Sequence, residues 1–141
     1  GAGSVGENAS TSKGGGNGGA GLASSISGSK VFYAGGGGGM AYDTQHPWYS
    51  LGGAGGGGNG GSYNNNANYT AFNLSGVSNT GGGGGAYGPT GATGAAGGSG
   101  IVIIRYPSFY ANAIATTGSP ETYTTGFWRV YKFIYSGTIT F

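Results

Sequence analysis

Residues 43–50, DTQHPWYS, bring together three side-chain types that hydrolytic enzymes use. In a Ser-His-Asp triad, histidine takes the proton of a serine hydroxyl and a carboxylate orients the imidazole, which are roles that Ser50, His46 and Asp43 offer. A triad is defined by its geometry, and one short loop rarely supplies all three members. The sequence therefore predicts a polar surface loop here, with no catalytic residue.

Metal and phosphate sites are two further kinds of chemistry that this sequence could offer. Asp43 and His46 are metal-ligand types, but no third ligand lies near them in sequence and the chain has no cysteine. The glycine run 35–39 follows the strand-like residues 30–34, yet there is no GxxxxGK[ST] motif and no helix is expected after the run. We expect no metal, no cofactor and no enzymatic activity.

Aromatic and amide side chains are concentrated in two inserts between glycine runs, residues 40–51 and 62–79. Recognition surfaces typically combine rigid aromatic side chains with polar side chains that can adjust their hydrogen bonds to a ligand. Such a surface would suit a glycan or a surface protein; alternatively, the aromatic rings simply cover a glycine-rich body that has no side chains of its own. The candidate receptor-binding residues are Tyr42, Asp43, His46, Trp48, Tyr49, Tyr63, Asn65, Asn68, Tyr69 and Phe72.

Glycine dominates the first hundred residues and is rare after them. The chain has 38 glycines in 141 residues, and only Gly118, Gly126 and Gly137 lie beyond residue 100. Charged residues make up 6% of the chain and the formal net charge is +2, which argues against an ordinary solvated tail and a nucleic-acid-binding stripe. No apolar run approaches the roughly 18 residues of a membrane-spanning helix. The chain starts at Gly1 rather than Met, so we expect a processed or partial chain.

The glycine runs predict a body of extended chain. Extended glycine can adopt the threefold left-handed helix of polyproline II, with a rise of about 3.1 Å per residue and no internal hydrogen bonds. Neighbouring helices must then satisfy its N–H and C=O groups. The runs that would form such rods are residues 14–16, 35–39, 55–58 and 81–85. Residues 88–97 repeat glycine at every third position, but Gly98 breaks the collagen-like phase.

Residues 101–141 predict a small antiparallel β module. IVIIRY, which begins at Ile101, is a continuous apolar run of strand length, and Pro107 ends it, so residues 101–107 are expected to act as a clamp strand. Residues 127–135, FWRVYKFIY, form a second predicted strand, with Ser136–Gly137 as the expected turn into 138–141. The predicted fold class is mainly irregular and β without α-helix. A bundle of polyglycine II-type helices with connecting loops spans 1–100, and the β module, with its strand pair in 121–141, spans 101–141.

The predicted strands of the β module have apolar residues on both faces. A strand pair is marginal in water without a further strand or a packed partner, so we expect residues 121–141 to add to the sheet of a neighbouring copy. The candidate assembly residues are Ile101, Ile103, Trp128, Val130, Ile134 and Phe141. Arg105, Arg129 and Lys132 are expected to reach solvent or to pair across strands.

Three stretches of the sequence resemble a known family. GGSGIVIIRYP, the opening GAGSVGENASTSKGGGNGGA and the final FWRVYKFIYSGTITF are similar to segments of the glycine-rich domains of bacteriophage tail proteins. In adhesins at the tips of tail fibres, such domains are sandwiches of polyglycine II helices whose loops present the host-binding surface. The resemblance implies a structural, non-enzymatic component of a tail fibre or fibre tip, located in the virion tail.

The expected partners follow from this interpretation. They are copies of the chain itself or other virion tail proteins, and a host-surface glycan or protein, with neither nucleic acid nor membrane insertion. Two alternatives stay open, both extracellular. One is a self-assembling subunit of a filament, and the other is a carbohydrate- or ice-binding module.

Overall fold

The computed structural model describes residues 1–10, 14–42, 50–63, 69–70, 73–87 and 94–141. These residues contain no helix and only short strands, so the prediction of a mainly irregular and β fold is confirmed for them. The chain divides into two compact units. The first comprises Gly1–Ala23 and Phe32–Ser99, and the second comprises Ser24–Val31 and Gly100–Phe141. The sequence did not predict that residues 24–31 belong with the C-terminal module.

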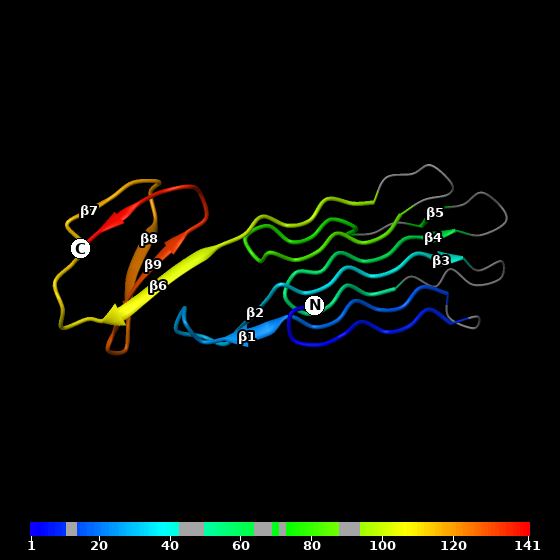
Figure 1. Ribbon diagram of the computed structural model, residues 1–141, viewed down its shortest axis with the longest axis horizontal. Helices are drawn as coiled ribbons and strands as arrows, with labels where there is room; N and C mark the ends of the chain where they lie inside the picture. Colours follow the sequence, from blue (N-terminus) through cyan, green and yellow to red (C-terminus); the bar gives the residue numbers. More distant parts are fainter. Residues whose placement is uncertain (11–13, 43–49, 64–68, 71–72, 88–93) are drawn as a thin grey trace. The chain divides into compact units, whose positions relative to one another are not determined.

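The first unit is built from extended segments that run alternately in opposite directions (Figure 1). Three short strands form one sheet in the order β3-β4-β5: β3 is Ala41–Tyr42, β4 is Ser62–Tyr63 and β5 is Tyr69–Thr70. β1 (Leu22–Ser24) and β2 (Val31–Tyr33) pair where the chain passes from the first unit to the second and back. Most of the described glycine lies outside these strands.

Backbone hydrogen bonds between the glycine segments repeat every three residues. From segment 35–41 to segment 55–61, the N–H donors and the C=O acceptors both advance by three: Gly35 to Gly55, Gly38 to Gly58 and Ala41 to Gly61, each with N···O of 2.9–3.0 Å. A pleated strand alternates its hydrogen-bonding groups with a period of two. A period of three means that the bonds to one neighbour use only every third residue.

The remaining groups bond to other segments. Gly58 and Gly61 donate to the carbonyls of Gly83 and Ala86, and these two residues in turn donate to Gly35 and Gly38. The parallel segments 35–41, 55–61 and 80–86 are therefore bonded pairwise in a closed triangle. Segments of opposite direction are bonded as well, as in Gly98 N–H to Gly82 O. This confirms the expectation that neighbouring glycine segments exchange backbone hydrogen bonds.

Glycine also forms the interior of the first unit. Its buried positions include Gly19, Gly21, Gly35, Gly38, Gly58, Gly60, Gly61, Gly82 and Gly85. Several larger apolar side chains of this unit, such as Val5, Leu51 and Val77, are exposed instead, and Met40 and Leu74 are only partly buried. A Cβ on Gly58 would clash with the Leu74 carbonyl oxygen of the adjacent segment. The segments are thus packed backbone to backbone, at a separation that leaves no room for side chains.

The second unit contains the largest sheet that the structure describes, in the order β6-β9-β8. β6 (Val102–Pro107) and β8 (Glu121–Thr125) both pair antiparallel with the central strand β9 (Trp128–Phe133). β8 and β9 are joined by Gly126–Phe127, and Gly126 has a φ of 55°. Glycine at the first central position is typical of a type II′ hairpin turn, which matches the twist of the two strands.

One strand pairing differs from the prediction. Ser136–Gly137 does not turn β9 back on itself. β10 (Ile139–Thr140) instead pairs antiparallel with β7 (Ala115–Thr116). β8 and β6 already occupy both edges of β9, so the chain after β9 has to find another partner. The Thr117 and Thr138 hydroxyl groups, 2.9 Å apart, continue the β7–β10 contact.

Both faces of the β6-β9-β8 sheet are covered. Successive residues of a strand face opposite sides of a sheet, so Val130 and Tyr131 lie on different faces. On the Val130 face, residues 24–31 are attached by Arg105 Nη1 to Ser25 O (3.1 Å) and by Tyr123 Oη to Ser27 O (2.9 Å). On the Tyr131 face, the Ala113 N–H donates to the Tyr131 hydroxyl at 3.0 Å. Val130 is fully buried, and Tyr131 and Phe133 nearly so.

Candidate functional site

Tyrosines from three separate segments lie in one row of the β3-β4-β5 sheet. Tyr42 pairs with Tyr63 across the parallel strands β3 and β4, and Tyr63 pairs with Tyr69 across the antiparallel strands β4 and β5. The preceding row contains Ala41 and Ser62, both buried. β3 leads into the first aromatic insert and β4 begins the second. The sheet therefore brings the starts of both inserts together, a convergence that the sequence did not predict.

The other candidate receptor-binding residues fall outside the residues that the structure describes. These are Asp43, His46, Trp48, Tyr49, Asn65, Asn68 and Phe72. Ser50 is described: its side chain is only 3% exposed, and its hydroxyl donates to the carbonyl of Gly15 at 2.6 Å. This hydroxyl joins two extended segments, and the burial of Ser50 differs from the surface position expected for residues 43–50.

The candidate assembly residues occupy different environments in the second unit. Val130 has no exposed side-chain surface, so contact with another chain would require the module to open. Ile101 and Ile103 are partly buried, while Trp128, Ile134 and Phe141 are exposed. The strands of residues 121–133 pair with β6 of the same chain.

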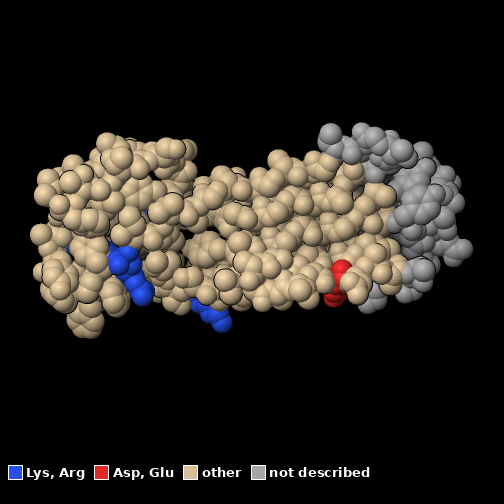
Figure 2. Space-filling model, viewed as in Figure 1, with Lys and Arg blue, Asp and Glu red and all other residues tan. Residues whose placement is uncertain are grey.

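The cations of the second unit are engaged with neighbours. Lys132 forms a cross-strand ion pair with Glu121 (2.9 Å), in agreement with the prediction for the strand cations. The Arg105 guanidinium lies 4.4 Å from the centroid of the Trp128 ring, a cation–π contact. Arg129 donates to the carbonyl of Tyr110. Much of the visible surface of the protein carries neither acidic nor basic side chains (Figure 2).

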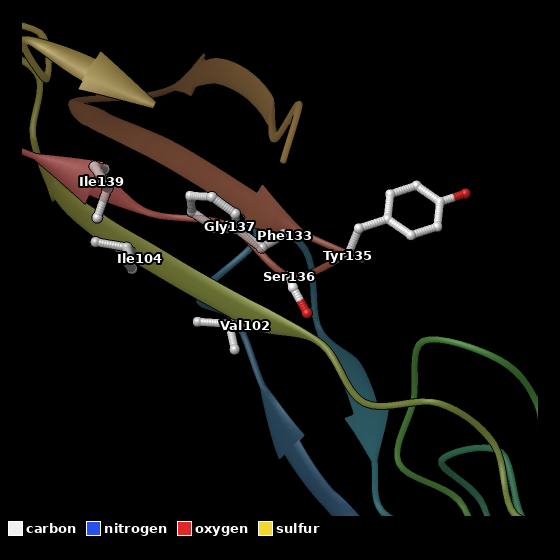
Figure 3. A pocket seen from close by; sticks show the side chains of 7 residues that line it. All are labelled: Val102, Ile104, Phe133, Tyr135, Ser136, Gly137 and Ile139. Carbon is white, nitrogen blue, oxygen red and sulfur yellow. The ribbon is translucent and has the colours of Figure 1, made fainter. Parts of the chain in front are cut away.

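Two hollows in the second unit are lined mainly by apolar residues. One, of about 320 Å³, lies between the ends of β6 and β9 and residues 135–139, with Ile104, Phe133 and Ile139 in its lining (Figure 3). The other, of about 500 Å³, is lined by residues of β6 and of the segment after it. Ile104 lines both, so the two hollows share a border. The sequence signal for the second is the aromatic pair Phe109–Tyr110 just after Pro107.

Neither a cluster of metal-ligand side chains nor a membrane-spanning helix is found among the described residues. Within them, no three residues of the types His, Cys, Asp and Glu gather closely enough to hold a metal ion. The same part of the chain has no helix with the length and apolar character needed to cross a bilayer.

The family-model comparison matches residues 1–107 to a glycine-rich domain. This chain belongs to the glycine-rich domain family. The match covers the first unit and extends to Pro107, the last residue of β6. The matched region thus includes β6, and residues 108–141 lie beyond it. No curated protein and no solved structure matches the chain.

Tyr106 joins the segment after β6 to the sheet, and its ionisation provides a pH test. Partial burial, followed by the hydrogen bond with Tyr131, raises the pKa of Tyr106 above its ordinary value of 10.0. As the pH rises through 10, the unfolded chain loses this proton before the folded chain does, so folding becomes less favourable. In urea unfolding between pH 9 and 11, wild type should lose more stability than Tyr106→Phe. Parallel losses in the two proteins would contradict this assignment.

Proposed function

We propose that this glycine-rich domain protein is a structural, non-enzymatic component of a phage tail appendage. In this proposal the first unit is a bundle of polyglycine II-type helices and its insert end contacts a host-surface glycan or protein. The observation that carries the recognition part is the row of Tyr42, Tyr63 and Tyr69 at the starts of the inserts. The resemblance of residues 1–20, 97–107 and 127–141 to tail-protein segments supports the phage assignment.

The hydrogen-bond pattern supports polyglycine II-type helices. A threefold helix presents its N–H groups in three directions, each repeated every third residue. The bonds from segment 35–41 to segment 55–61, and the closed triangle that they form with segment 80–86, have this period. Each backbone bond contributes on the order of 1 kcal/mol net, so such a body is stable only because many form together. A stiff, thin body of this kind suits a fibre or a fibre tip.

The backbone register supports recognition at the tyrosine row. Residues directly opposite each other on paired strands share a face of the sheet, and neighbouring strands are about 4.8 Å apart. The row lies next to the buried pair Ala41 and Ser62, so it is attached to the packed part of the first unit. A row of aromatic residues at this spacing would offer a continuous platform for sugar rings.

The experiment replaces the row and measures binding to an array of purified bacterial surface polysaccharides and lipopolysaccharides. The triple variant Tyr42→Ser, Tyr63→Ser and Tyr69→Ser should lose at least tenfold in apparent affinity for the array member that wild type binds. Tyr135→Ser, an exposed tyrosine of the second unit, is the control and should bind as wild type does. Equal binding by the triple variant, or no binding by wild type, would contradict the glycan-binding part of the proposal. We expect tail and baseplate genes beside the coding sequence, and other neighbours would count against the phage assignment.

A further inference from the structure

An apolar cleft in the second unit has a volume of about 500 Å³. β6 contributes Ile104 and Tyr106 to its lining, and the segment 108–114 contributes Tyr110 and Ile114. Phe141 lies at the same cleft, with its ring edge-on to Tyr106 at a centroid distance of 5.4 Å. The cleft is therefore formed by residues from three parts of the C-terminal module.

Polar contacts hold the segment 108–114 in place. Arg129 donates to the carbonyl of Tyr110, and the Tyr106 hydroxyl donates to the carbonyl of Ala111 at 3.1 Å. The N–H groups of Ala113 and Ile114 donate to the Tyr131 hydroxyl and the Thr140 carbonyl, at 3.0 and 2.8 Å. The segment therefore binds the module through backbone groups rather than through its apolar side chains.

The apolar side chains of this segment are exposed: Phe109 by 79%, Tyr110 by 60% and Ile114 by 79%. Phe141, at the same cleft, is 64% exposed. The Phe109 and Tyr110 rings lie 4.5 Å apart, so Phe109 adjoins the cleft. A segment that only covered the sheet would bury such residues and expose its polar groups, and the opposite arrangement indicates a surface prepared for binding.

The charges near the cleft indicate an uncharged partner. Arg105 contributes to the lining, but its guanidinium is engaged with the Trp128 ring and the carbonyl of Ser25. Arg129 is bound to Tyr110 O. Both guanidinium groups near the cleft are thus already held by contacts within the module, and the remaining exposed lining is mainly apolar, so the surface favours an apolar surface like its own.

The exposed area fits a second copy of this chain. An aromatic side chain has about 150–250 Å² of surface, so the four exposed residues present on the order of 500 Å² per copy. Two copies then bury roughly 1,000 Å², the lower bound for a biological interface and the range of weak, reversible association. One face holds both a cleft and a projecting aromatic residue, Phe109, as a twofold self-complementary contact requires.

We propose that two copies of this chain associate through this cleft, with the segment 108–114 of each copy packed against that of the other. β8 and β9 are already paired with β6 within the chain, so this contact takes the place of strand exchange. The inference goes beyond the proposed function and is independent of the phage and receptor assignments. Its partner is chemically defined as an identical, uncharged apolar surface.

The experiment is sedimentation of the full 141-residue chain between 1 and 100 μM. Wild type should sediment as a dimer, and Phe109→Ser with Ile114→Ser should weaken association at least 100-fold. The matched control, Phe127→Ser with Tyr135→Ser, removes two comparably exposed rings outside the cleft lining and should stay within threefold of wild type. A monomeric wild type at 100 μM, or equal weakening by the control, would overturn the proposal.

A cross-linking experiment keeps the test decisive if the double variant fails to fold. The chain has no cysteine, so Ile114→Cys introduces a unique thiol. A short bis-maleimide should join Ile114→Cys chains into covalent dimers and leave Phe127→Cys chains monomeric. A dimeric protein that cross-links equally at both positions, or at neither, would show that the copies meet elsewhere. Polysaccharide binding by the tyrosine row is measured separately, so its failure would not be mistaken for failure of the dimer.

Discussion

Gly58→Ala is expected to destabilise the first unit by about 1–3 kcal/mol, because the added methyl group has no space. Gly58 is buried, and its N–H and C=O bond to Gly83 O and to the Gly38 N–H. A Cβ would clash with the Leu74 carbonyl oxygen, so the adjacent segments would have to separate and their hydrogen bonds would lengthen. The change removes no side-chain contact, and the loss therefore measures backbone-to-backbone packing directly.

Hydrogen–deuterium exchange of the amides in residues 53–61 is the measurement. They should exchange roughly 5- to 160-fold faster in Gly58→Ala, which corresponds to the same free energy. Gly94→Ala is the matched control, because among the described residues its Cβ would meet only the Gly85 oxygen, at 3.9 Å. It should change stability by less than about 0.5 kcal/mol. Equal exchange in the two variants would contradict the close packing of the glycine segments.

Val130→Asp is expected to unfold the second unit. Val130 is fully buried at the centre of β9, and a carboxylate there would cost about 3–5 kcal/mol, because the guanidinium of the opposite residue, Arg105, is already engaged with the Trp128 ring and Ser25 O. A module of this size has a total stability of roughly 3–5 kcal/mol. The cost of the buried carboxylate is therefore comparable with the total free energy of unfolding of the second unit.

The near-ultraviolet circular dichroism of the aromatic residues reports this loss, since Trp128 and Tyr131 belong to the same sheet. Val102→Asp makes the same substitution on β6 at a side chain that is mostly exposed, and should keep the signal. Glycine amides of the first unit should keep slow exchange in both proteins, because the two units are separately compact. Loss of the signal in both variants, or in neither, would contradict the burial of Val130 as the cause.

The sequence by itself determined which segments of this protein are β-strands and which are extended glycine-rich segments. Ile101–Tyr106 and residues 127–135 predicted β6 and β9 to within two residues at each end, because β-branched and aromatic runs of this length favour strands. Glycine without Cβ atoms predicted extended segments joined by backbone bonds, which the hydrogen bonds of segment 35–41 confirm. These properties are local, so they can be read from residue types alone.

The tertiary structure decided which segments meet. Local sequence favours a hairpin turn at Ser136–Gly137. Because β8 and β6 occupy the two edges of β9, however, β10 pairs with β7. Strand pairing depends on this competition between distant segments, and local turn propensity does not contain it. The same holds for residues 24–31, whose attachment depends on Arg105 and Tyr123 lying on one face of the sheet.

The candidate sites divide in the same way. Aromatic and amide composition identified the inserts, but only the register of β3, β4 and β5 places Tyr42, Tyr63 and Tyr69 in one row. Val130 could be assigned to a strand from its neighbours but not to the buried centre of a sheet, because burial is set by what covers both faces. The exposed residues of segment 108–114 were missed, since their exposure follows from polar anchors on β6 and β9 that sequence spacing does not reveal.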